Sequence, residues 1–239
     1  MTYDPRPPFS GSFPESTGPV GPARAAALPG ELALVGGAEW SAGCEVFDSE
    51  LLGAAGSKEV VVLPTAAAYF APLGASVKAC MVLRRADAED RANAGTVRAA
   101  KFVYLAGGSV LHLRSVLKAS AVWDALVEAW KDGTVVAGSS AGAMVLGDAM
   151  VDPRGGALTL GLGLLPQLAV LPHAASWSEE KTHRTVKLAS GGLRIAAIDE
   201  RTALLRGADG RWRVAGEGKV TIWLNGQVDG IDALGEAGG

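Results

Sequence analysis

The sequence predicts an α/β protein built on a mostly parallel central sheet, with a β meander at its C-terminal end. Short continuous apolar runs, which are typical of buried parallel strands, recur between residues 31 and 137. Segments with helical patterns lie between these runs, so this half of the chain is expected to consist of βαβ units. Residues 195–224 instead contain short apolar runs separated by turns, which favours strands that follow one another directly.

The composition is that of a globular protein with one large core. The chain has 239 residues, of which 49% are hydrophobic and 20% charged. A net charge of −3 argues against nucleic acid or an acidic membrane as the main partner. Cys44 and Cys80 are too few for a disulfide framework and lack the spacing of metal ligands. With no spanning apolar run and no secretory signal in view, we expect a cytoplasmic protein without metal or other cofactor.

The domain is expected to begin near residue 30. Residues 1–29 are rich in proline, glycine and serine and have no apolar period, so they are expected to form a flexible N-terminal arm. Residues 30–239 are then expected to form a single domain. Its first half should contain strands at 31–35, 60–63, 80–83 and 102–105, with helices at 45–52, 66–78 and 90–99. Two further helices should follow, one with an apolar face from Val110 to Leu117 and one capped by Ser120.

The next strand, 134–137, leads into Gly138-Ser139-Ser140-Ala141-Gly142 and then into a helical segment. A strand, a tight Gly-x-Ser-x-Gly turn and a helix form a nucleophile elbow, which exposes the serine and holds it rigidly. Ser140 is therefore the candidate nucleophile. The pair Gly107-Gly108 also follows a strand, and the carboxyl ends of parallel strands share one edge of a sheet. We expect both segments to border the same pocket.

A serine nucleophile needs a general base, and the chain has three histidines. His112 falls in an apolar helix, where a structural role is expected. His173 follows the expected strand 168–171 at its carboxyl end, on the same edge as Ser140. His183 lies in a polar stretch, 179–187, and remains the alternative base. On this placement His173 is favoured.

A carboxylate should orient the imidazole of the base. Asp199-Glu200 follows the expected strand 195–198, and Glu200 is preferred, with Asp199 in reserve. The remaining strands of the meander are expected at 202–206, 212–214 and 220–224. An α/β-hydrolase would have its histidine last in the chain, whereas the order here is Ser140, His173, Glu200.

Several motifs together resemble the cyanophycinase and peptidase E (aspartyl dipeptidase) family of serine peptidases. They are Leu105-Ala106-Gly107-Gly108, Val136 to Ala143, Gly161 to Leu165 leading to Pro172-His173, and Ile198 to Ala203. The resemblance covers roughly residues 31–228. It implies a three-layer, flavodoxin-like fold, similar to class I glutamine amidotransferases, with helices on both faces of the sheet. It also implies Ser140 as nucleophile, His173 as base, Glu200 as acid, and the N–H groups of Gly108 and Ala141 as the oxyanion hole.

Some positions depart from the family pattern. Ser109-Val110 replaces the usual Asn or Asp–Gln after the paired glycines, and Ala174 replaces a phenylalanine after the base. The arginines that cyanophycinases carry soon after this histidine are absent, and the next arginine is Arg184. These positions shape the substrate pocket, where Ser109 and Arg184 are candidate substrate-binding residues.

The resulting expectation is a serine peptidase that hydrolyses a peptide or isopeptide bond of a small substrate, aspartate-containing substrates included. The alternatives are a small-amide or ester hydrolase on the same triad and a catalytically silent binding domain. A homodimer is left open.

Overall fold

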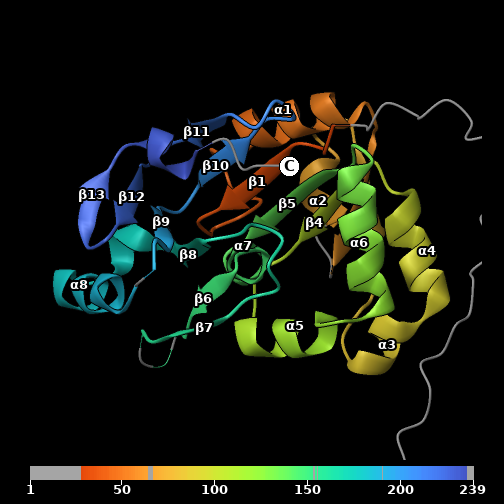
Figure 1. Ribbon diagram of the computed structural model, residues 1–239. Helices are drawn as coiled ribbons and strands as arrows, with labels where there is room; N and C mark the ends of the chain where they lie inside the picture. The colour runs from red at the N-terminus through yellow and green to blue at the C-terminus, as the bar shows by residue number, and fades with distance from the viewer. Residues whose placement is uncertain (1–27, 64–66, 153, 155, 190, 236–239) are drawn as a thin grey trace, which may run out of the picture.

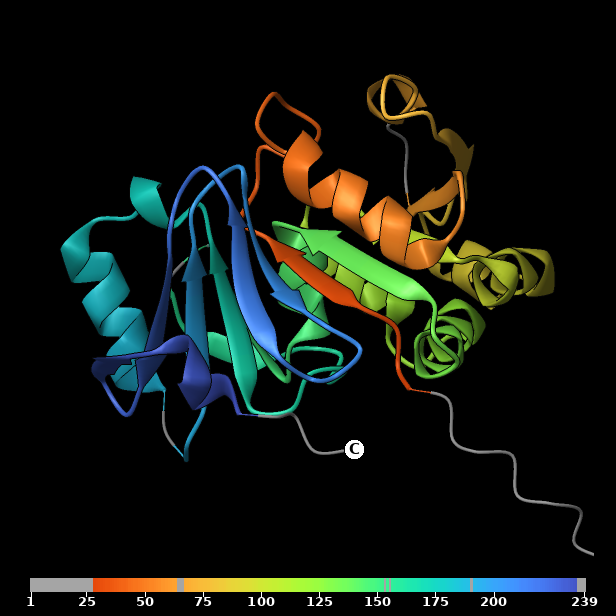
Figure 2. The ribbon, with the colours of Figure 1, turned by 90° about the horizontal axis from the view of Figure 1, so that it is seen from above.

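The computed structural model describes residues 28–63, 67–152, 154, 156–189 and 191–235, and the predicted arm lies outside this range except for its last two residues. The described residues form a seven-stranded sheet with helices on both faces and a four-stranded sheet beside it (Figure 1 and Figure 2). The α/β fold class predicted from the sequence is thereby confirmed.

The central sheet has the strand order β11-β10-β1-β5-β4-β2-β3. Its parallel part contains β1 (Leu32–Val35), β2 (Glu59–Leu63), β3 (Ser76–Ala79), β4 (Phe102–Leu105) and β5 (Val135–Ser139). Two antiparallel strands, β10 (Thr202–Arg206) and β11 (Trp212–Gly216), extend it beyond β1. Strand β5 lies between β1 and β4, so the carboxyl ends of these three strands meet at one edge.

Alternate residues of the central strands pack against different helices, because successive side chains in a strand point to opposite faces. Leu32 and Leu34 share a core with α3 (Arg85–Glu89), α4 (Arg91–Ala99), α5 (Val110–Leu117), α6 (Ala121–Lys131) and α7 (Ala141–Leu146). Ala33 and Val35 face the other way, in a second core with α1 (Glu45–Ala55) and α2 (Ala67–Phe70). Burial on both faces explains why these strands are continuously apolar.

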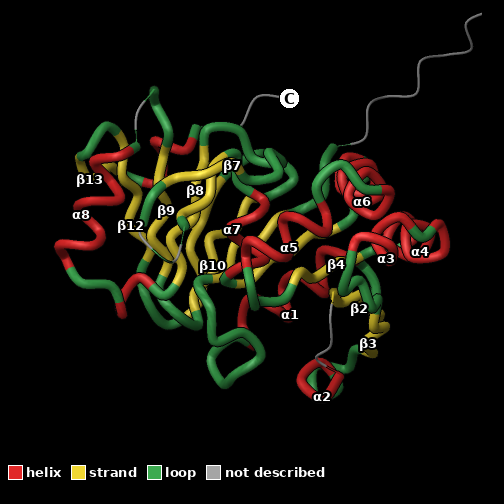
Figure 3. Tube along the Cα trace, turned by 90° about the horizontal axis from the view of Figure 1, so that it is seen from below, coloured by secondary structure: helices red, strands yellow, loops and turns green. Residues whose placement is uncertain are grey.

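The four-stranded sheet has the order β13-β12-β9-β8. Its strands are β8 (Leu168–Pro172), β9 (Arg194–Ile198), β12 (Val220–Leu224) and β13 (Gln227–Asp229), with β8 and β9 parallel. Helix α8 (Glu179–Leu188) packs Val186 against this sheet and lies at the end of the molecule opposite α3 and α4 (Figure 3). A hairpin of β6 (Ala149–Val151) and β7 (Leu158–Leu160) precedes β8, and short 3₁₀ turns occur at Ala174–Ser176 and Ile231–Leu234.

The C-terminal strands alternate between the two sheets. Strand β9 pairs with β8 and β12, whereas β10, which follows it in sequence, pairs with β1. The connection from β9 to β10 therefore passes beside the carboxyl end of β1, where Gly36 N–H donates to Thr202 O over 3.0 Å and Arg201 N–H donates to Gly37 O over 3.0 Å. This crossing brings Asp199 and Glu200 to the edge that carries the elbow.

Two expected elements are wrong. The helix expected at 66–78 is limited to α2, and β3 occupies Ser76–Ala79 instead of the strand expected at 80–83. Pro72 and Gly74 follow α2 and disfavour its continuation. Strand β3 is a sheet edge, and its residues are largely exposed, so it lacks the apolar run that marks the inner strands.

Candidate active site

The elbow forms between β5 and α7. Ser140 has φ 49° and ψ −109°, a strained conformation for a residue other than glycine, and its N–H donates to Val35 O over 2.9 Å. Glycine is required on both sides by close backbone contacts. A Cβ on Gly138 would lie 2.6 Å from the carbonyl carbon of Gly142, and a Cβ on Gly142 would lie 2.1 Å from Leu105 O. The packing of α7 against β4 and β5 thus fixes the position of the Ser140 side chain.

His173 follows β8 and contacts the elbow. Its Nε2 lies 3.0 Å from Ser140 Oγ. The backbone of His173 is left-handed, with φ 53°, and its N–H donates to Gly36 O over 2.7 Å. Gly37 borders the imidazole so closely that a Cβ there would lie 2.2 Å from Cε1 of His173. The ring is therefore positioned by the connection that follows β1.

Glu200 follows β9 and completes the chain of contacts. Its Oε1 lies 2.7 Å from Nδ1 of His173, on the side of the ring opposite Ser140. Asp199 has a different environment, because its Oδ2 accepts from the N–H of Lys219 over 3.1 Å. Of the two carboxylates considered from the sequence, the structure brings Glu200 to His173.

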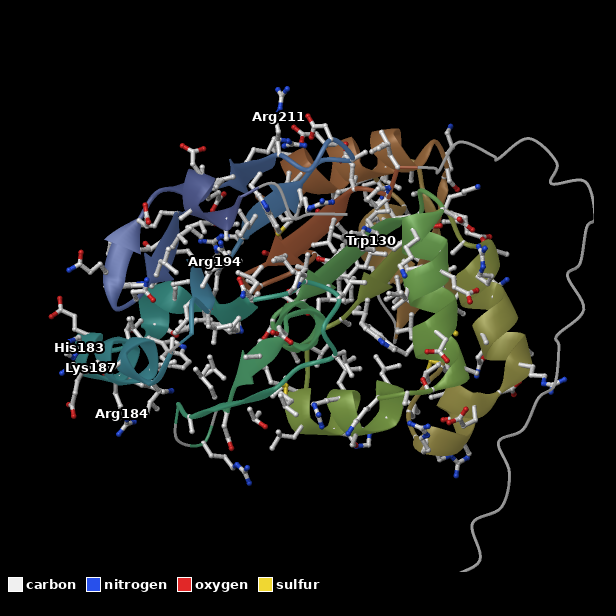
Figure 4. The ribbon with its side chains drawn as sticks, viewed as in Figure 1. Trp130, His183, Arg184, Lys187, Arg194 and Arg211 are labelled. Atoms are coloured by element: carbon white, nitrogen blue, oxygen red, sulfur yellow. The ribbon has the colours of Figure 1, made fainter. Side chains whose placement is uncertain are left out.

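The other two histidines lie elsewhere. His112 Nε2 lies 2.8 Å from Leu83 O, beside α3. His183 is exposed on α8 and projects from the outer end of the molecule (Figure 4). Of the three histidines, only His173 contacts Ser140.

A cleft of about 440 Å³ opens in front of Ser140. The predicted oxyanion-hole residues Gly108 and Ala141 both line it, as does Ser109, whose Oγ also accepts from the N–H of His112 over 3.4 Å at the start of α5. Gly108 has φ 134°, a conformation that glycine adopts readily. The other residues around the cleft are Val110, Leu111, Met144, Arg154, Pro172, His173, Ser176, Trp177 and Lys181.

The cationic side chains at this cleft are Arg154 and Lys181, and the structure does not bring Arg184 there. Arg184 is exposed on α8 and points away from the rest of the molecule (Figure 4). Lys181 Nζ lies 3.8 Å from the centre of the Trp177 ring. Arg154 donates two guanidinium hydrogen bonds and one backbone hydrogen bond to the Asp152 carboxylate, and together they lower the pKa of Asp152 to about 2. Sequence reasoning missed both cations, because they come from a hairpin loop and a helix without a recognisable motif.

Sequence reasoning also missed the connection that follows β1. Gly36 and Gly37 contact His173 and the β9–β10 connection, and Glu39 contacts both Gly107 and Ser139. The signal was present in the sequence as a glycine pair at the end of a buried strand, the same pattern that marked Gly107-Gly108.

Both cysteines, Cys44 and Cys80, are free and buried, and burial raises the pKa of each thiol. Within the described part of the chain, no helix combines the length and apolar character needed to cross a membrane.

Comparisons with known proteins identify the family of this chain. The model of peptidase family S51 matches residues 33–211. A cyanophycinase of Synechococcus elongatus is 31% identical over 156 residues, a match that covers 58% of this chain and 46% of that protein. The chain thus spans about half the length of this relative. A cyanophycinase of Trichormus variabilis is 27% identical over 213 residues, which cover 79% of this chain and 72% of that protein.

Two solved structures are similar. A peptidase from an acI-B1 Actinobacterium superposes with a TM-score of 0.76 at 26% identity, covering 85% of this chain and 94% of that one. A protein from Listeria monocytogenes described as a putative peptidase E has a TM-score of 0.56 at 19% identity, covering 82% of this chain and 98% of that one, and it supports the fold alone. Since the family model matches most of the chain, and these relatives agree with the motifs recognised in the sequence, the chain belongs to peptidase family S51.

Proposed function

We propose that this protein is a serine peptidase that hydrolyses a peptide or isopeptide bond of a small substrate. Ser140 acts as nucleophile, His173 as general base and acid, and Glu200 as the group that orients the imidazole. The observation that carries the proposal is the pair of contacts from Ser140 Oγ to His173 Nε2, 3.0 Å, and from His173 Nδ1 to Glu200 Oε1, 2.7 Å. Both distances are those of hydrogen bonds, which proton transfer between these groups requires.

The reaction proceeds through an acyl-enzyme. Ser140 Oγ attacks the carbonyl carbon of the scissile bond while its proton passes to Nε2 of His173, and Glu200 stabilises the resulting imidazolium. The negative oxygen of the tetrahedral intermediate accepts hydrogen bonds from the N–H groups of Gly108 and Ala141. The C–N bond then breaks, and the amine leaves with the proton from His173. Water repeats the sequence on the acyl-enzyme, which releases the acid and restores Ser140.

The cleft favours a small substrate that carries a carboxylate. Its volume, about 440 Å³, is that of a site for a small molecule or a short peptide. Lys181 gives it positive charge, because among the described residues it forms no ion pair with a carboxylate, whereas Arg154 is already paired with Asp152. A carboxylate of the substrate, such as an aspartate side chain or a chain terminus, is the group that Lys181 attracts. Aspartate-containing dipeptides are therefore the first substrates to test.

A fluorophosphonate probe tests the proposal, because only an activated serine reacts with it. Ser140 Oγ forms a bond to phosphorus, fluoride leaves, and the serine proton passes to His173. We expect the wild-type protein to be labelled on Ser140. The Ser140→Ala protein should fold but should not be labelled, and its rate of peptide hydrolysis should fall by a factor on the order of 10⁶. The matched control is Ser115→Ala, which alters a serine on the surface of α5.

The labelled residue is identified by mass spectrometry, and hydrolysis is followed with α- and β-linked aspartyl dipeptides. An unlabelled wild-type protein would favour a silent binding domain. Labelling on Ser140 together with cleavage of esters but no peptide would favour an esterase.

A further inference from the structure

The carboxylate of Glu39 connects two parts of the site that sequence motifs identify separately. Its Oε1 accepts a hydrogen bond from Gly107 N–H over 3.0 Å, in the glycine segment that follows β4. Its Oε2 accepts from Ser139 Oγ over 2.8 Å, in the residue that precedes the nucleophile. Glu39 thus bridges the Gly107–Gly108 segment and the elbow, and it is not among the residues that line the cleft.

The backbone around Glu39 is held in an unusual conformation. Ala38 and Trp40, on either side of it, have φ angles of 51° and 62°, which are uncommon for residues other than glycine. Ser41 Oγ donates to Ala38 O over 2.6 Å, and the Trp40 ring packs on Tyr104 with centroids 5.3 Å apart. Strain of this kind persists only where surrounding contacts enforce it, and it concentrates at functional sites. These contacts fix where the Glu39 carboxylate lies.

The two groups that donate to Glu39, Gly107 N–H and Ser139 Oγ, each require a fixed hydrogen-bond acceptor at this position. Ser139 is fully buried, so its hydroxyl requires a hydrogen-bond partner inside the protein. Ala106 N–H is anchored on Leu63 O, and Ser109 Oγ caps α5, so the paired glycines Gly107 and Gly108 lie between two fixed points. Glycine has the largest conformational freedom of any residue, and an oxyanion donor must be fixed before the reaction to be effective.

We propose that Glu39 is a positioning residue that holds the Gly107–Gly108 segment in register with the elbow, so that the Gly108 N–H meets the oxyanion formed at Ser140. This inference rests on the proposed function, because it assigns Glu39 a part in the same reaction. The hydrogen bonds of the Glu39 carboxylate go to Gly107 and Ser139, whereas those of Ser140 Oγ and the His173 ring go to each other and to Glu200. Its loss should slow the chemical step and leave the binding of the probe or substrate largely unchanged.

Two substitutions with side chains about as long as that of glutamate distinguish the effect of the hydrogen bonds from the effect of the space that the side chain fills. In Glu39→Gln, the amide oxygen can accept from Gly107 N–H while the amide NH₂ donates to Ser139 Oγ, so the bridge is retained without the charge. Glu39→Met fills a similar volume but accepts no such hydrogen bond. The matched control is Glu45→Ala, because Glu45 Oε2 likewise accepts from a backbone N–H, that of Gly43, over 2.7 Å, but at the start of α1.

The experiment measures saturable labelling by a fluorophosphonate, which gives the maximal rate of inactivation, kinact, and the concentration for half-maximal rate, KI. Misplacement of a reacting group by about 1 Å costs about 10²-fold in rate, so we expect Glu39→Met to lose about 10²-fold in kinact with KI within about threefold of wild type. Glu39→Gln should recover most of this loss, and Glu45→Ala should match wild type. Melting temperatures identify variants that have lost their fold. If Glu39→Met does not fold, Ser139→Ala, which removes one arm of the bridge, should lose about tenfold in kinact.

The inference is overturned if Glu39→Met folds and is labelled as fast as wild type, or if Glu39→Gln loses as much as Glu39→Met. It is also overturned if the loss appears in KI instead of kinact, or if Glu45→Ala is equally impaired. Failure of the proposed function gives a different result, since the wild-type protein itself would then not be labelled.

Discussion

At the scale of single residues, the site concentrates unusual backbone conformations. Ser140, His173 and Arg201, which directly follows Glu200, have φ angles of 49°, 53° and 52° although none is glycine. Ser140 and His173 directly follow strands β5 and β8, and Arg201 directly precedes β10. Each donates a backbone hydrogen bond to segment 35–37, at the carboxyl end of β1. Residues in sparsely populated conformations cost about 1–3 kcal/mol each, and such strain is found where geometry serves a function.

The first prediction at this scale concerns the base. His173→Ala should slow fluorophosphonate labelling of Ser140 by on the order of 10²–10⁴-fold, because general-base assistance typically contributes that much. His183→Ala is the matched control and should stay near the wild-type rate, since its side chain is exposed on α8. Loss of labelling in His183→Ala with retention in His173→Ala would show that the polar stretch 179–187 supplies the base.

A second prediction concerns Asp48, which is fully buried in α1. Burial raises the pKa of Asp48 from 3.8 to about 7, although the nearby Tyr69 hydroxyl opposes this shift. Between those two values the folded chain holds a proton that the unfolded chain has released. The free energy of unfolding should therefore fall as pH rises through this window, by at most about 1.4 kcal/mol per pH unit from this group, and level off above about pH 7.

Urea unfolding of wild type and Asp48→Asn at about pH 5 and about pH 7 measures this dependence. The variant carries no titrating group at this position, so its free energy of unfolding should fall less than that of wild type between the two pH values. Asp124→Asn, which alters an exposed carboxylate on α6, is the control and should follow wild type. Equal pH dependence in wild type and Asp48→Asn would contradict the prediction.

At the scale of elements, sequence patterns identified the buried strands and missed two exposed elements. Strands β1, β2, β4 and β5 are inner strands with apolar residues on both faces, and their continuous apolar runs predicted them to within one or two residues. Strand β3 is an exposed edge, and the polar composition of α8 left its helical structure unassigned. The composition of a short segment therefore indicates burial on both faces more directly than it indicates whether the segment is a helix or a strand.

The next prediction concerns Gly142, at the boundary between β5 and α7. Gly142→Ala would place Cβ 2.1 Å from Leu105 O, so α7 or β4 must move. Overpacking of this kind typically costs 1–3 kcal/mol, which should exceed the gain of about 1 kcal/mol from the higher helix propensity of alanine. Gly95→Ala, in α4, meets no atom within 4 Å and should be stabilised by about 0.5–1 kcal/mol. Urea unfolding measures the stability of both variants. A Gly142→Ala protein as stable as wild type would show that residue 142 and Leu105 O can move apart at no cost in free energy.

At the scale of the whole molecule, the site lies where two sheets meet. Ser140 follows β5 of the seven-stranded sheet, whereas His173 and Glu200 follow β8 and β9 of the four-stranded sheet (Figure 1). All three residues were candidates from the sequence because each follows an expected strand. It could not predict that β10 pairs with β1, nor that Glu39 reaches Gly107 and Ser139, because pairings between distant segments leave no local pattern.

The last prediction tests whether the relative position of the two sheets governs the site. Gly36 directly follows β1, and a Cβ there would lie 2.1 Å from Asp199 O and 2.5 Å from Ile198 O, at the end of β9. Gly36→Ala should therefore push the two strand ends apart and lengthen the 3.0 Å contact between His173 and Ser140. Since a shift of about 1 Å at reacting groups costs about 10²-fold in rate, kinact with a fluorophosphonate should fall by about that factor.

Gly30→Ala is the matched control, because a Cβ there would lie 1.9 Å from Thr134 O at the opposite end of β1, away from the second sheet. Both substitutions should lower the melting temperature, since both force a carbonyl to move. Only Gly36→Ala should also lower kinact when labelling is measured well below the melting temperature of each protein. If the two variants lose stability equally and neither loses labelling rate, the sheets can separate at this point without disturbing the contact between Ser140 and His173. The position of the His173 imidazole would then depend on the Gly37 contact with the ring and not on the junction of β1 with β9.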